Sequence, residues 1–187
     1  FNDDISVIDL EKGKEQCRIP VQREPVAADI SRDGRFLLVA NLLHTVPADA
    51  ERVGATVSVI DTAARKVVKE LSLPDGSGFL NDLRVSPDGK YAVVTHILSR
   101  FRLPATQLDR GWMNSNAATL IDLARMEILN TVLLDNIDRG AADPWGIAWS
   151  ADSATLLITH AGTHEVSVID FPAVLTRLAK IPATPDT

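Results

Sequence analysis

The chain has 187 residues, 45% of them hydrophobic, which is enough to bury a sizeable core in one soluble globular unit. Its formal net charge is −6 and no basic run appears, so nucleic acid is not expected as a partner. No stretch approaches the roughly 20 apolar residues of a membrane span. The single cysteine, Cys17, excludes an internal disulfide and a Cys-x-x-Cys-His haem attachment.

A recurring string that ends in Asp sets the architecture. It occupies residues 5–9, 57–61, 119–122 and 166–170, with 52, 61 and 48 residues between successive aspartates. These spacings are somewhat above the roughly 40–45 residues of one four-stranded propeller blade. The sequence therefore predicts stacked blades with insertions.

In chain order, the protein is expected to open with the last two strands of a blade, over 5–22, with Cys17 half-buried on the second. Three repeats follow, over 25–73, 79–134 and 144–171. Each contains a turn, typically Ser-x-Asp-Gly, between two short β-type strands, because Asp bonds nearby backbone and Gly accepts positive φ. We therefore predict an all-β fold with about three and a half blades of four antiparallel strands.

Past the last repeat the pattern changes to a short helix over 172–180, with Pro172 at a favoured first position. Residues 181–187 are predicted to be a Pro/Thr linker, and residues 1–171 to be a partial propeller. Bare faces on the end blades would expose several hundred Å² of apolar surface. We therefore expect this segment to belong to a larger propeller of six to eight blades, or to close a ring by self-association.

The strings Leu-Val-Ala-Asn at 38–41, Ser-Pro-Asp-Gly-Lys-Tyr at 86–91 and Val-Ser-Val-Ile-Asp-Thr at 57–62 resemble the bacterial YVTN-type β-propeller repeat family. The resemblance covers residues 5–171. It implies a seven-bladed propeller on a periplasmic, secreted or cell-surface bacterial protein, and similar propellers are joined to c-type cytochrome domains. Ser153 departs from the pattern, because the family has Gly there.

Repeats one and two carry extra residues between their second and third strands, at 44–53 and 97–116. In a propeller these loops share one face, here called the insertion face, with the loops that precede each first strand. The longer insertion combines cationic and aromatic side chains that are frequent in recognition sites. The ligand- or partner-binding residues expected there are Arg100, Arg102, Arg110, Trp112 and Asn114. The alternative is that this loop packs on its own propeller.

The tenth residue after each turn serine is Asn41, His96 or His160. Two histidines in equivalent positions of neighbouring blades suggest a metal site, with Asp82 as a further ligand or an orienting group. The alternative is a polar strand-end residue that bonds loop backbone. Trp145 and Trp149 have the spacing of one strand face and are expected in the core.

No Gly-x-Ser-x-Gly elbow, phosphate-binding glycine loop or paired-cysteine metal motif is present. The leading hypothesis is a non-catalytic binding or scaffold propeller whose insertion face contacts a ligand, a protein partner or a downstream domain. One alternative is the propeller module of a metal- or haem-linked redox protein, and a weaker one is a lactonase-type hydrolase. The sequence itself requires no cofactor; a metal or haem in a partner domain is compatible with it.

Overall fold

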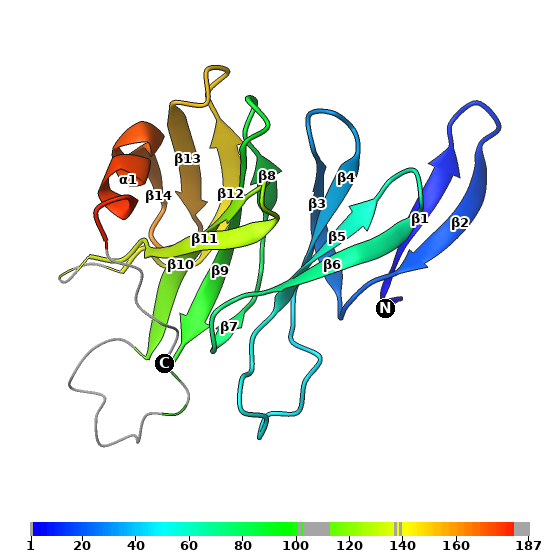
Figure 1. Ribbon diagram of the computed structural model, residues 1–187. Helices are drawn as coiled ribbons and strands as arrows, with labels where there is room; N and C mark the ends of the chain where they lie inside the picture. Colours follow the sequence, from blue (N-terminus) through cyan, green and yellow to red (C-terminus); the bar gives the residue numbers. More distant parts are fainter. Residues whose placement is uncertain (1, 101, 103–112, 137, 139, 182–187) are drawn as a thin grey trace.

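The computed structural model describes residues 2–100, 102, 113–136, 138 and 140–181. Within them the chain forms antiparallel sheets and a short helix, and the sheets follow one another from the N-terminal pair to the C-terminal sheet (Figure 1). The all-β, antiparallel prediction is confirmed, and the arrangement is β-propeller-like. No helix in this described part has the length and apolar character that crossing a membrane requires.

Four sheets are present in the described residues. The first contains β1 (Asp4–Asp9) and β2 (Lys14–Pro20). The second contains β3 (Pro25–Ile30), β4 (Phe36–Asn41), β5 (Thr56–Asp61) and β6 (Lys66–Ser72). The third contains β7 (Ser77–Gly78), β8 (Leu83–Val85), β9 (Tyr91–Ser99), β10 (Asn114–Asp122) and β11 (Glu127–Leu133). The fourth contains β12 (Pro144–Trp149), β13 (Thr155–His160) and β14 (Glu165–Asp170), and α1 (Phe171–Leu178) follows.

The Ser-x-Asp turn carries its own hydrogen bonds in each repeat. In the second sheet the Ser31 hydroxyl donates to Asp33 at 2.6 Å and accepts the Phe36 N–H at 2.9 Å. The Ser31 hydroxyl, followed by the Arg35 N–H, holds the pKa of Asp33 below its ordinary value. The third repeat keeps this turn although Ser153 replaces glycine, with a φ of 61°. A turn built from local bonds is one that sequence alone can predict.

The Asp at the end of the third strand in each unit also organises the chain that follows it. Asp61 accepts the Ala64 N–H at 2.8 Å, and Asp9 and Asp122 accept equivalent bonds in their own turns. The fourth residue after each of these aspartates has positive φ. These positions are Gly13, Arg65 and Met126. After Asp170 the same carboxylate instead caps α1 by accepting the Ala173 N–H at 3.0 Å.

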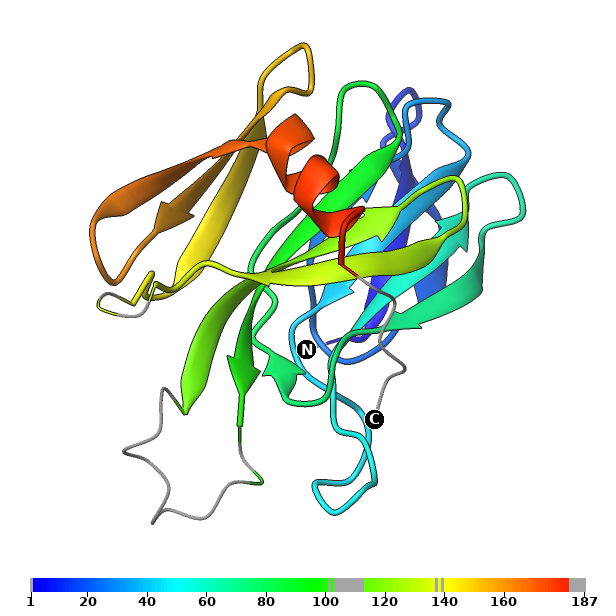
Figure 2. The ribbon, with the colours of Figure 1, turned by 60° about the vertical axis from the view of Figure 1, so that its left-hand side comes forward.

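Three apolar clusters hold adjacent sheets together. Leu38, Val59 and Leu83 are fully buried between the second and third sheets. Residues of β13 pack with those of β10 between the third and fourth sheets, and Phe171 makes edge contacts with the rings of Tyr91 and Trp149. Figure 2 shows α1 lying between the fourth sheet and β11. Val174, Leu175 and Leu178 of the helix pack against the apolar cluster that joins these two sheets.

Two expectations need correction. Trp145 is 56% exposed, whereas Trp149 packs in the core against Phe171, so the two do not share a face. A shift in register between Pro144 and Ile147 interrupts the alternation on which that expectation rested. The longer insertion also contributes strand: β9 and β10 stay paired as far as Ser99 and Asn114, and β7 pairs with β9 on its other side.

Candidate functional site

On the insertion face, Arg102 connects the two inserted segments. Its guanidinium donates to the backbone carbonyls of Ala50, at 2.9 Å, and Glu51 in the first insertion. Its Nε also lies 3.3 Å from the Asp75 carboxylate, which in turn accepts the Val53 N–H at 2.7 Å. One cation therefore ties the second insertion to the first insertion and to the loop before β7.

Two of the other expected contact residues, Arg100 and Asn114, lie at the base of the same hairpin. Arg100 is exposed, and its N–H donates to the Met113 carbonyl at 2.7 Å. Asn114 is exposed and accepts the Ser99 hydroxyl at 2.8 Å. Arg110 and Trp112 lie outside the described residues. The bridge made by Arg102 matches the self-packing alternative, while Arg100 and Asn114 leave exposed polar groups beside it. Binding by these residues stays a prediction.

Asn41, His96 and His160 hold equivalent positions, and each makes a side-chain hydrogen bond to the adjacent strand. We call this repeated bond the hydroxyl rung. In the second, third and fourth sheets this side chain bonds to a hydroxyl three residues before the repeat Asp. The pairs are Asn41 Nδ2 with Ser58 Oγ at 3.0 Å, His96 Nε2 with Thr119 Oγ1 at 2.8 Å, and His160 Nε2 with Ser167 Oγ at 2.8 Å. The spacing that indicated convergent metal ligands therefore coincides with a bond inside each sheet.

The hydroxyl rung continues onto the fourth strand where one exists. Ser58 donates to the Glu70 carboxylate at 2.9 Å, and Thr119 Oγ1 lies 2.7 Å from Thr131 Oγ1. Glu70 and Thr131 are each nine residues past their repeat Asp. In the fourth sheet β14 is the last strand, so the rung stops at Ser167.

Both histidines use their second nitrogen on backbone carbonyls. His96 Nδ1 lies 3.3 Å from the Ile97 oxygen, and His160 Nδ1 lies 2.9 Å from the Ala141 oxygen. Burial lowers the pKa of His96 to about 4, so its ring is neutral at pH 7. This geometry favours the alternative of a strand-end residue that bonds backbone.

Asp82 stabilises the contact between the third and fourth sheets. One carboxylate oxygen accepts the Leu83 N–H at 2.8 Å, and the other accepts the Ile147 N–H at 2.9 Å and lies 3.4 Å from Arg84 Nε. Within the described ranges, no three His, Cys, Asp or Glu side chains converge to hold a metal ion. A metal site at His96, His160 and Asp82 stays a hypothesis.

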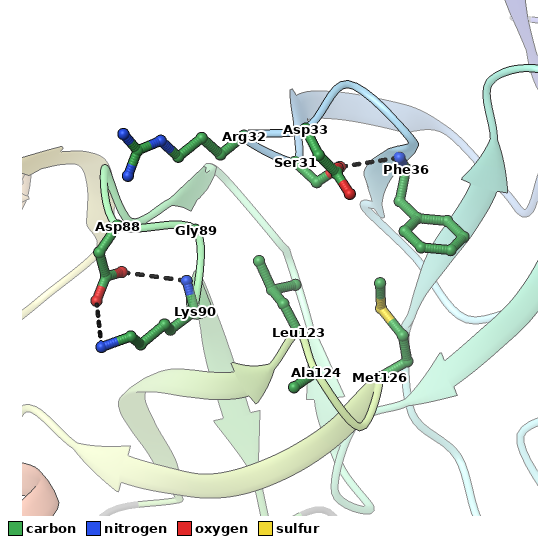
Figure 3. Close-up of a pocket in the computed structure, with 10 residues that line it drawn as sticks. All are labelled: Ser31, Arg32, Asp33, Phe36, Asp88, Gly89, Lys90, Leu123, Ala124 and Met126. Carbon is green, nitrogen blue, oxygen red and sulfur yellow. Dashed lines mark hydrogen bonds and ion pairs between the residues drawn. The ribbon is translucent and has the colours of Figure 1, made fainter.

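A pocket on the face opposite the insertions was not expected from the sequence. It has a volume of about 580 Å³ and lies between the turns of the second and third sheets (Figure 3). Phe36, Leu123 and Met126 line its apolar side, and Arg32 and Lys90 lie at its polar side. Lys90 pairs with Asp88 at 3.6 Å. Arg32 and Lys90 hold different positions in their two turns, so no repeated spacing in the sequence pointed to this pocket.

The chain is similar to a protein and to a solved structure that both carry the name hydrazine synthase. No family model matches it. The chain is 30% identical over 151 residues, 81% of its length, to a protein named hydrazine synthase subunit beta from Kuenenia stuttgartiensis. A solved structure of Kuenenia stuttgartiensis hydrazine synthase matches 96% of the chain with a TM-score of 0.84 and 28% identity. The chain spans 37% of the first protein and 49% of the matched chain in the second.

Proposed function

We propose that this chain is a non-catalytic β-propeller scaffold module that contacts a protein partner through its insertion face, in an enzyme assembly related to hydrazine synthase. The similarity to a protein named as a subunit of that enzyme carries the proposal. A subunit is by definition bound to other chains. The bridge from Arg102 to the first insertion supports a preformed contact surface, because segments that are already held together lose less entropy on binding.

We also propose that this chain is part of a closed, ring-shaped propeller. The sheets correspond to about three and a half four-stranded blades of a larger propeller, for which seven blades are proposed from the resemblance of the repeats. Exposed apolar residues on the two end sheets support this: Ile8 on β1, and Val166 and Val168 on β14. We also propose a periplasmic or extracellular location, which fractionation of the native cells tests.

The test is co-purification with the remaining subunits of the Kuenenia stuttgartiensis enzyme. A tagged form of the chain is co-expressed with them, beside a variant in which a Gly/Ser linker replaces residues 100–113. The matched control carries Arg32→Ala and Lys90→Ala on the opposite face. We expect the original and the control to retain the same partner subunits and the linker variant to lose them. Equal retention by the linker variant, or no retention by the original, contradicts the proposal.

A further inference from the structure

The pocket between the turns of the second and third sheets is bounded by elements that this chain supplies in full. Residues 31–36 lie on one side of it, and residues 88–90 and 123–126 lie on the other (Figure 3). The second sheet has four strands and the third has five, so neither is an incomplete end sheet. The pocket therefore does not depend on how the ring is completed. Its volume of about 580 Å³ suits a small molecule.

In the third sheet, the turn aspartate has an ammonium partner of its own. Asp88 Oδ1 accepts the Ser86 hydroxyl at 2.6 Å and the Lys90 N–H at 3.1 Å. The other carboxylate oxygen, Oδ2, lies 3.6 Å from Lys90 Nζ. One oxygen therefore holds the turn, and the second is left for a cation, which the lysine four residues after the turn serine supplies.

In the second sheet, the equivalent cation is placed elsewhere. Asp33 Oδ1 accepts the Ser31 hydroxyl and the Arg35 N–H in the same way. Arg35 stands at the position equivalent to Lys90, but its guanidinium lies over the Phe36 ring, 4.8 Å from the ring centre. Within the described part of the chain, Asp33 Oδ2 has neither a hydrogen bond nor an ion pair. The pocket thus contains a charged acceptor whose cation is missing.

Apolar side chains lie across the pocket from this carboxylate. Leu123 and Met126, from the turn between β10 and β11, lie below Asp33 in Figure 3, and Phe36 lies beside Met126. All three apolar residues belong to the cluster between the second and third sheets, so packing holds them in place. An alkyl chain that lies over them can keep a charged end at Asp33, and the flexible Met126 side chain can adjust to it.

The basic residues that line the pocket do not favour an anion. Figure 3 shows Arg32 and Lys90 extending to the Asp88 side, away from Phe36. An anion placed between their charged ends would meet the Asp88 carboxylate. The charge that faces the apolar side chains is instead the carboxylate of Asp33, so the complementary ligand is a cation with an apolar chain.

We propose that this pocket binds a linear aliphatic amine in its ammonium form, with the ammonium on Asp33 Oδ2 and the alkyl chain on the apolar side chains opposite. The ammonium takes the place that Lys90 Nζ has in the neighbouring turn. The pocket lies on the face opposite the insertions, so this proposal does not depend on the proposed partner contact.

The probe is hexylammonium chloride, titrated into the full chain at neutral pH and followed by two-dimensional ¹H–¹⁵N NMR. The matched ligand is 1-hexanol, which has the same alkyl chain without the charge. We expect saturable shifts at residues 31–36, 88–90 and 123–126, and binding of hexylammonium about fivefold tighter than that of hexanol. Asp33→Asn keeps the oxygen that holds the turn and should remove this preference. Asp152→Asn makes the same change in the turn of the fourth sheet and should leave the preference unchanged.

Circular dichroism with thermal melting verifies that both variants are folded. No saturable binding, equal binding of the two ligands by the original chain, or an unchanged preference in Asp33→Asn overturns the proposal. Shifts confined to other residues also overturn it, because the ligand would then occupy a different surface. Loss of the preference in Asp152→Asn has the same meaning, since overall charge rather than Asp33 would then select the ammonium.

Discussion

Replacing His96 by Asn should make the fold less sensitive to acid. Burial lowers the pKa of His96 to about 4 in the folded chain, whereas the ordinary value of 6.5 applies once the chain unfolds. Below pH 6.5 the unfolded chain therefore binds a proton that the folded chain does not, and stability is lost as the pH falls from 6.5 towards 4. Asn is the matched replacement because Asn41 holds the equivalent position in the second sheet.

The size of the effect follows from the two pKa values. Between pH 7.5 and pH 5 the difference in proton uptake costs the original protein about 2 kcal/mol that the His96→Asn variant does not lose. At a typical urea dependence this is a difference of about 1 M in the shift of the unfolding midpoint. Urea titrations at both pH values, followed by tryptophan fluorescence, measure it. Equal midpoint shifts for the two proteins would refute the reasoning.

Three further substitutions test the packing. Phe171→Ala removes a buried ring from contact with Tyr91 and Trp149 and should lower the free energy of unfolding by about 3–5 kcal/mol in urea titrations, while Phe171→Leu should cost less. Asp82→Ala leaves the Ile147 N–H without its acceptor and should lower the free energy of unfolding by about 1–3 kcal/mol. An unchanged urea midpoint would show that this contact between the sheets does not stabilise the fold. Gly76→Ala places a Cβ against the Ser99 carbonyl at a φ of +86° and should lower the melting temperature by several degrees, at about 2 kcal/mol or more.

The parts of the fold that the sequence predicts are those formed by neighbouring residues. The turn at Ser31 and Asp33 is fixed by bonds within five positions, and it repeats, so its strands could be assigned from composition and spacing. The exposure of Trp145 could not be assigned, because a bulge in β12 depends on how β13 pairs with it.

In the candidate site, too, the sequence indicated local features but not contacts between distant residues. The recurrence of His96 and His160 was visible in the sequence, but their partners lie 23 and 7 residues away, and only the sheet register identifies them. The bridge from Arg102 to Ala50 joins residues 52 positions apart in the sequence. No periodic pattern reports a contact of that kind. The serines and threonines three residues before each repeat Asp were the one signal for the hydroxyl rung that the spacing contained.

The Asp that ends each third strand begins two different structures in this chain. In three units it starts a hairpin whose fourth residue takes positive φ, and in the last it starts a helix. Val174 occupies that fourth position after Asp170, and a β-branched residue there resists positive φ, while Pro172 suits a first helical turn. The same carboxylate bond, to the N–H three residues on, therefore begins both a hairpin and a helix, and the residues that follow it decide which of the two forms.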